Sequence, residues 1–268
     1  MRICALGDLL LDVIVRVSEP IVPGADSAAT TRIGAGGQAA NVAAWAVELG
    51  AEGRFVGKRA ADAAGEFVAA ELEARGVEVR GPVEPGGSGV VVSLVDASGE
   101  RTMLSDRGVA PDLRPDELEP AWLAGCDWLH LTGYSLLRSP IAEAAEAAVA
   151  ACDGRLSVDL SSWTAIRDFG PARLRERLAR LEPDVVFGNS EEWDALGPLD
   201  APVRVVKRGA QGFTVLDGSS ETAVEPGGGA VVDSTGAGDA LTAGFLVGGP
   251  DLAREAAARC VGRLGAMP

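Results

Sequence analysis

The chain has 268 residues, of which 47% are hydrophobic and 24% are charged, so it can bury an ordinary core and is not expected to be disordered. Its 24 lysines and arginines against 39 aspartates and glutamates give a net charge of −15, which argues against nucleic acid or an anionic membrane as a partner. No stretch resembles a secretion signal or a membrane span, so we expect a cytoplasmic protein with a single domain over residues 1–268.

The cysteines and the histidine limit the chemistry. Cys4, Cys126, Cys152 and Cys260 are scattered in apolar contexts without C-x-x-C spacing, which favours buried free thiols over disulfides or zinc. His130 is the only histidine and lies in a strand-like run, so we interpret it as a structural residue. A metal centre built on a cluster of histidines is therefore excluded.

The first 33 residues contain three predicted strands. A short apolar strand over residues 2–6 is followed by residues 9–17 and 28–33, which alternate like half-exposed strands. Two strands that leave a core and return predict a flap or lid over a pocket. Asp12 lies at the point where the chain first leaves the core. On the sequence alone it can be a simple turn residue at a strand end.

Residues 34–50 are expected to form a glycine turn that opens an amphipathic helix, which Gly50 ends. Gly36 and Gly37 allow backbone amides to approach a ligand closely. Asn41, one turn into the helix, offers both a donor and an acceptor. The pattern therefore predicts a polar site at the start of this helix.

A β-hairpin is expected further along, because residues 89–95 and 100–104 flank a turn of polar and small residues at 96–99. The chain then returns to the core past Arg107, which is either a substrate ligand or a solvated surface arginine. With the earlier departing strands, the hairpin forms a predicted lid of residues 12–33 and 88–108.

Strands and helices alternate through most of the remaining chain. Strands are expected at residues 128–131, 156–159, 185–188 and 203–207, and helices near residues 65–75, 140–151 and 172–181. This alternation predicts a parallel sheet covered by helices on both faces, with ligands bound at the carboxyl ends of the strands.

Two polar motifs fall at such strand ends. Asn189 and Glu192 form N-x-x-E, which is either a capping box or a polar pair that faces a ligand. Lys207 is followed by Gly209 and Gly212, which places a cation beside two flexible backbone positions.

The stretch from Asp233 to Asp239 is the most informative one. It follows a strand-like run at residues 230–232 and leads into a helix, so a glycine turn and a helix N-terminus together predict an anion site. Gly236 and Gly238 let successive N–H groups converge on one point. A carboxylate at Asp239 would repel an anion, unless it takes a proton from a nucleophile beside a group that is becoming more negative. The plain alternative is an ordinary helix start.

These motifs resemble, in the same order, the signatures of the ribokinase-like (PfkB) carbohydrate kinases. The matching stretches are D-[ST]-x-G-A-G-D at residues 233–239, G-G-x-x-x-N-x-A at 36–43, N-x-x-E at 189–192, K-x-G-x-x-G at 207–212 and R-x-G-A-x-P at 263–268. The resemblance implies a three-layer α/β/α fold with a mostly parallel central sheet and a small β-sheet lid.

The resemblance also implies roles for individual residues. Asp239 would be the catalytic base on the sugar hydroxyl, and the amides of Gly236, Ala237 and Gly238 would hold the transferring phosphoryl group. Substrate contacts would come from Asp12, Gly36, Gly37, Asn41 and Arg107, and nucleotide contacts from Asn189, Lys207, Gly209, Gly212 and Thr235. Asn189 and Glu192 would order Mg²⁺ largely through water, and Asp233 and Thr235 would lie beside a monovalent cation such as K⁺ if one is used.

We therefore expect an enzyme that transfers the γ-phosphoryl group of ATP·Mg²⁺ to a hydroxyl of a small sugar or sugar acid. A non-catalytic sugar- or nucleotide-sensing homologue is one alternative, against which Asp239 and the N-x-x-E motif argue. A dinucleotide-binding oxidoreductase would need G-x-G-x-x-G after the first strand, where this chain has Gly7-Asp8-Leu9.

A nucleoside kinase on the same fold is the other alternative. The lid stretches contain no Phe, Tyr or Trp that could stack on a base, and Trp45 is the nearest candidate. They carry instead Arg16, Arg32, Arg101 and Arg107. Because Arg107 can pair bidentately with a carboxylate, we favour a ketose or keto-sugar acid as the substrate. In that family the lid edges of two chains often pair. A homodimer that forms through the lid is therefore one further possibility for this chain.

Overall fold

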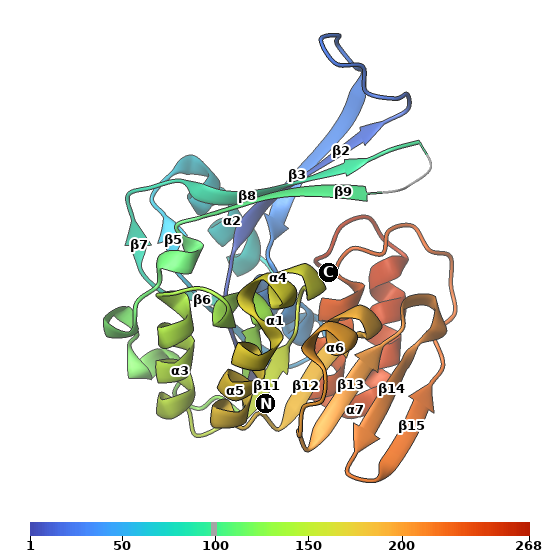
Figure 1. Ribbon diagram of the computed structural model, residues 1–268. Helices are drawn as coiled ribbons and strands as arrows, with labels where there is room; N and C mark the ends of the chain where they lie inside the picture. The colour runs from blue at the N-terminus through green and yellow to red at the C-terminus, as the bar shows by residue number, and fades with distance from the viewer. Residues whose placement is uncertain (98–100) are drawn as a thin grey trace.

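A nine-stranded sheet forms the centre of the computed structural model, which describes residues 1–97 and 101–268 (Figure 1). The strand order is β15-β14-β13-β12-β11-β10-β1-β4-β6, and all neighbours from β13 to β6 are parallel. The strands are β1 (Arg2–Leu6), β4 (Glu52–Val56), β6 (Glu78–Arg80), β10 (Trp128–Thr132), β11 (Arg155–Asp159), β12 (Val185–Asn189), β13 (Val203–Lys207), β14 (Phe213–Asp217) and β15 (Ser220–Val224).

Helices cover both faces of this sheet, as the alternation of strands and helices predicts. They are α1 (Gln38–Glu48), α2 (Ala63–Glu73), α3 (Ile141–Ala151), α4 (Trp163–Phe169), α5 (Pro171–Leu181), α6 (Ser190–Leu196) and α7 (Ala237–Val261). On β1, Ile3 and Ala5 join the core formed with α1, α2 and α7, whereas Cys4 and Leu6 join the core formed with the other helices. The predicted three-layer α/β/α class is therefore confirmed.

A separate four-stranded sheet, called the small sheet below, projects beyond the carboxyl ends of the central strands (Figure 1). It contains β3 (Ala29–Gly36), β2 (Leu10–Val17), β8 (Ser88–Val95) and β9 (Arg101–Gly108), in that order across the sheet. The predicted hairpin is present as β8 and β9, although residues 98–100, which include part of its turn, lie outside the described residues. A further two-stranded sheet pairs β5 (Arg59–Ala60) with β7 (Val83–Glu84).

One local prediction about the second half of the chain needs correction. Residues 230–232 do not form a strand, and Val231 and Val232 are largely exposed, so the apolar run has no sheet to join. The central sheet is mostly parallel, as predicted, and ends in β14 and β15, which form an antiparallel hairpin on β13.

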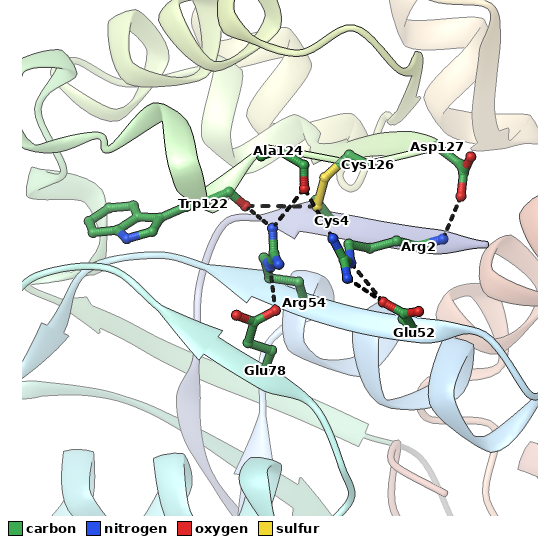
Figure 2. Close-up of a disulfide and its surroundings, with 9 residues drawn as sticks. All are labelled: Arg2, Cys4, Glu52, Arg54, Glu78, Trp122, Ala124, Cys126 and Asp127. Carbon is green, nitrogen blue, oxygen red and sulfur yellow. Dashed lines mark hydrogen bonds and ion pairs between the residues drawn. A yellow bond between two sulfur atoms is a disulfide. The ribbon is translucent and has the colours of Figure 1, made fainter.

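The prediction that all four cysteines are free thiols is wrong for two of them. Cys4 of β1 and Cys126, just before β10, form a disulfide with their Cα atoms 5.9 Å apart (Figure 2). The pairing arises because the loop that leads into β10 passes beside β1, where Arg54 also donates to the carbonyl oxygen of Trp122 at 2.6 Å. Cys152 and Cys260 are free, as predicted.

His130 lies in the core, as predicted for a structural residue. It is fully buried on β10, and its Nδ1 lies 3.0 Å from the Ser157 hydroxyl. Burial lowers the pKa of His130 to about 4, so the ring is neutral at physiological pH. Within the described part of the chain, no helix has the length and apolar character needed to cross a membrane.

Candidate active site

A cavity of about 970 Å³ lies between the carboxyl ends of the central strands and the small sheet. Its wall brings together eight of the residues selected from the sequence: Asp12, Gly37, Asn41, Arg107, Asn189, Thr235, Gly236 and Asp239. Asn189 reaches the cavity from the carboxyl end of β12, and Asp12 and Arg107 reach it from β2 and β9 of the small sheet. The others lie at or just before the starts of α1 and α7.

Asp239 lies in the first turn of α7 and lines this cavity. The Nδ2 of Asn41 donates to its Oδ2 at 2.7 Å. Burial raises the pKa of Asp239 to about 7, and the Asn41 hydrogen bond opposes that shift. The carboxylate is therefore held in one orientation and titrates close to neutrality, as a general base for a hydroxyl requires.

The turn before α7 requires a glycine at position 236. Gly236 caps the helix with φ of 76°, and a Cβ there would lie 2.5 Å from the Cα of Ala266. No alanine could take this conformation without displacing the loop after α7. The first amides of the helix that follows have no partner within that helix, and this setting favours an anion.

Asp12 reaches the cavity from β2 because Gly36, diagonally across from it on β3, has no side chain. A Cβ on Gly36 would lie 2.2 Å from the Asp12 carboxyl carbon. Gly37 has φ of 101°, and a Cβ on it would lie 2.3 Å from the carbonyl oxygen of Asp8. The two glycines thus make room for protein groups at the start of α1. Burial also raises the pKa of Asp12 to about 6.

Arg107 reaches the same cavity from β9, but its guanidinium group already has a partner. Its Nε and Nη2 donate to the two carboxylate oxygens of Asp8 at 2.5 and 2.8 Å. The guanidinium also lies over the ring of Tyr134, 5.5 Å from the centroid. The alternative of a solvated surface arginine is wrong, because only 19% of the side chain is exposed.

Lys207 and Asn189 end neighbouring strands, as their positions in the sequence predict. Lys207 Nζ lies 2.6 Å from Oδ2 of Asp159 on β11. Burial alone would lower the pKa of Lys207, but the carboxylates of Asp159 and Glu192 outweigh it and raise that pKa. The Lys207 side chain therefore stays protonated. It lies beside the first turn of α6, which contains Glu192.

Asn189 and Glu192 form the capping box that was one of the two interpretations of N-x-x-E. Asn189 Oδ1 accepts from the backbone N–H of Glu192, and Glu192 Oε2 accepts from that of Asn189, each at 2.8 Å. Burial raises the pKa of Glu192, while Lys207 opposes the shift. Across the described residues no group of three or more His, Cys, Asp or Glu side chains forms a metal cluster. A metal here would depend on phosphate oxygens and water for most of its ligands.

A second cavity of about 350 Å³ adjoins Lys207 on the side of α7. Gly209, Gly212 and Gly238 line it together with apolar side chains that include Phe213, Leu241 and Val261. A Cβ on Gly238 would lie 3.3 Å from Lys207 Nζ, so the cation sits directly against the glycine turn. An apolar slot that ends at a cation and a helix N-terminus suits a planar base with an attached phosphate chain.

Asp233 ties the turn to the loop that follows α7. Its Oδ1 accepts from the amide and hydroxyl of Thr235 at 2.9 and 2.6 Å, and its Oδ2 accepts from the amide of Gly265 at 3.0 Å. Trp45 contacts the same loop, donating from Nε1 to the carbonyl oxygen of Ala266 at 2.8 Å. Trp45 is fully buried and so is not available to stack on a substrate.

The family model described as pfkB family carbohydrate kinase matches residues 1–260. The chain belongs to this family. It is accordingly an ATP-dependent phosphotransferase that acts on a sugar hydroxyl.

This PfkB kinase is similar to proteins that are named for several different substrates. It is 33% identical over 260 residues to the ATP-dependent ribose-1-phosphate kinase of Halopiger xanaduensis, covering 92% of this chain and 84% of that protein. It is 31% identical over 176 residues to the 5-dehydro-2-deoxygluconokinase of Photobacterium profundum, covering 62% of this chain and 53% of that protein. Among solved structures, adenosine kinase from Sinorhizobium meliloti superposes with a TM-score of 0.85 at 25% identity, covering 99% of this chain and 95% of that one.

The PfkB motifs did not identify every residue that shapes the cavities. Asp8, Tyr134 and Asp159 were overlooked because each acts through a partner far away in the sequence. Gln38 was also overlooked, although its Oε1 accepts from the hydroxyl of Ser161 at 2.5 Å. The one local signal was the position of Asp8 two residues after a strand and of Asp159 at the last residue of one.

Proposed function

We propose that a small sugar binds in the cavity of about 970 Å³ and that Asp239 takes the proton from its attacking hydroxyl. The observation that carries this proposal is the setting of Asp239, which Asn41 holds at 2.7 Å and whose pKa burial raises to about 7. Such a base accepts a proton readily and is still present in its charged form at neutral pH. The rest of phosphoryl transfer is mainly positioning and charge stabilisation.

The sugar would lie between Asp12 and Asp239. Gly36 leaves the Asp12 carboxyl room to accept hydrogen bonds from hydroxyl groups. The Oδ1 of Asn41 is buried and accepts no hydrogen bond from the residues that the structure describes, so it offers a further acceptor. Acceptors that outnumber donors suit a substrate rich in hydroxyl groups.

The residues around the second cavity fit ATP bound with Mg²⁺, which would supply the phosphoryl group and neutralise the charge that develops on it. The apolar cavity of about 350 Å³ would take the adenine ring. Lys207, Gly209, Gly212 and Thr235 would contact the phosphates, and the amides of Gly236, Ala237 and Gly238 would receive the transferring group. Asn189 and Glu192 would orient waters around the metal while keeping their capping contacts.

A monovalent cation beside Asp233 and Thr235 remains part of the proposal. The carboxylate of Asp233 organises both the turn and the loop at Gly265, so a cation there would act on the shape of the phosphoryl site. Rates measured in equal concentrations of KCl, NaCl and choline chloride test this point. If the rate is the same in all three salts, the proposal of a monovalent cation site is wrong.

The small sheet is proposed to act as the lid of a single-domain kinase, and its outer face as a dimer contact. Ile33, Val13, Val92 and Leu104 form one row across its four strands, on the face opposite Asp12. Ile33 and Leu104 are 56% and 55% exposed. Exposed apolar side chains at the two edges of such a row favour contact with a second copy of the chain.

Nucleoside phosphorylation is the second candidate, and Tyr134 is the observation that favours it. This residue adds to the cavity wall an aromatic ring that the lid stretches lack. One face of the ring is already covered by Arg107, which leaves less of it for a base.

Release of ADP across a panel of acceptors at fixed Mg²⁺ and ATP tests the proposal. The panel contains pentoses, hexoses, their acids and phosphates, and nucleosides. We expect the highest kcat/KM for a sugar. A nucleoside that exceeds every sugar establishes the second candidate, and ATP binding without ADP release for any acceptor overturns both.

A further inference from the structure

We propose that Asp8 sets the substrate class of this site by neutralising Arg107, so that the cavity selects uncharged sugars over sugar acids. The inference rests on the proposed function and names the substrate class of the same site. It also departs from the expectation that Arg107 pairs with a substrate carboxylate.

The Asp8–Arg107 contact occupies the part of the guanidinium that a carboxylate would use. Arginine recognises a carboxylate with two parallel N–H donors. Here Nε and Nη2 form that fork and point at the two oxygens of Asp8, at 2.5 and 2.8 Å. The remaining terminal nitrogen, Nη1, lies 3.5 Å from the carbonyl oxygen of Tyr134. A substrate carboxylate would have to displace a protein carboxylate from an ideal geometry.

Asp8 is fixed in this position by the core of the protein. It lies two residues after the end of β1 and is only 6% exposed. Its carbonyl oxygen lies against Gly37, where even a Cβ would come within 2.3 Å. The backbone on this side therefore has no room to carry the carboxylate away from Arg107 when a ligand arrives.

The charges around the cavity lead to the same conclusion. The charged side chains that line it are those of Asp8, Asp12, Arg107 and Asp239, so Arg107 is the one cation among the described residues of its wall. Once Asp8 has neutralised Arg107, the other two charged groups are carboxylates. A substrate carboxylate would meet repulsion from both and find no free cation, whereas hydroxyl groups would find acceptors.

The experiment compares one neutral sugar, chosen as the best acceptor of the wild-type protein, with its own aldonic or uronic acid. We expect the wild type to favour the neutral member in kcat/KM by at least about tenfold, one factor of ten being about 1.4 kcal/mol. Asp8→Asn keeps the shape of the side chain and one acceptor but removes the charge. We expect it to raise the acid-to-neutral ratio of kcat/KM about tenfold or more.

Two further variants make the result specific. In Asp8→Asn combined with Arg107→Gln, the gain for the acid should disappear, because it requires the freed guanidinium. Asp112→Asn changes the net charge equally at an exposed arginine pair, 3.8 Å from Arg138 and outside the cavity wall, and should leave the ratio unchanged. A ratio that rises equally in Asp112→Asn, or does not rise in Asp8→Asn, overturns the inference.

Binding gives a second readout that does not need turnover. Thermal shifts of the folded proteins with the neutral sugar and with its acid should rank the two ligands as kcat/KM does. A wild-type protein that already prefers the acid overturns the inference, whether or not the Asp8 variant folds. Failure of the proposed function looks different, because then no sugar supports ADP release although the ranking of the bound ligands can still be measured.

Discussion

Asn41 Nδ2 donates a hydrogen bond of 2.7 Å to Asp239 Oδ2, although 198 residues separate the two in the chain. The contact joins the first turn of α1 to the first turn of α7. It connects the two signature motifs of the family into one site. The geometry of the proposed base therefore depends on the packing of α1 beside α7 as much as on the glycine turn around it.

Replacing Asp239 by Asn should lower turnover by a factor on the order of 10²–10⁴, because the amide keeps the shape but cannot accept the hydroxyl proton. Affinity for ATP, measured by calorimetry, should stay within about threefold. Turnover close to that of the wild type would remove Asp239 from the role of base.

The activity should fall at acidic pH. The pKa of Asp239 is raised to about 7, so the fraction of the charged, proton-accepting form declines about tenfold for each pH unit below that value. The pKa of Asp12 is raised to about 6, and protonation there should steepen the decline further. A profile of kcat/KM from pH 5 to 9 checks this. A flat profile between pH 5 and 7 contradicts it.

Glu192→Gln should raise the Mg²⁺ concentration needed for the half-maximal rate several-fold. The amide oxygen can still cap the helix, so the loss is confined to the negative charge near the metal. Glu191→Gln is the matched control, because it removes a charge from the exposed neighbour in the same helical turn. If both variants and the wild type need the same Mg²⁺ concentration, Glu192 only caps its helix.

Trp45→Phe should destabilise the protein without changing its choice of substrate. The substitution removes the hydrogen bond from Nε1 to the carbonyl oxygen of Ala266, and the loss of a buried bond costs about 1–3 kcal/mol. Denaturant unfolding measures that cost. The ratio of kcat/KM between a sugar and a nucleoside should stay within about twofold, and a larger change would mean that Trp45 contacts the acceptor.

Ile33→Asp should yield a monomer if the outer face of the small sheet joins two copies. A charge in an apolar contact loses its hydration without gaining a partner. Val83→Asp, at a similarly exposed position on β7, controls for the added charge. Light scattering over a range of concentrations compares the three proteins. A wild type that is already monomeric, or a variant that stays dimeric, rejects this contact.

The fold was largely predictable because its strands carry strong local patterns. The strand at residues 203–207 was predicted with its observed limits as β13. The failures occur where a strand needs a partner. Val231 and Val232 have strand-forming side chains but meet no sheet, and β14 was missed although Asp217 and Gly218 provide a hairpin turn signal.

The site was predictable only where its residues lie within one motif. The glycine turn at residues 233–239 was recognisable because all its parts are adjacent in sequence. The ion pair of Asp8 with Arg107 was not, because nothing in the sequence says which carboxylate a distant arginine will meet. The disulfide between Cys4 and Cys126 was missed for the same reason, since 122 residues separate the two cysteines.

The place of β1 in the central sheet has a consequence for the newly synthesised chain. This first strand lies between β4 and β10. β4 leaves the ribosome soon after β1, but β10 follows only on the order of ten seconds later, at about 5–20 residues per second. Throughout that interval one edge of β1 presents backbone N–H and C=O groups that have no strand to pair with. The nascent protein thus carries an aggregation-prone edge on a strand that will become interior to its sheet.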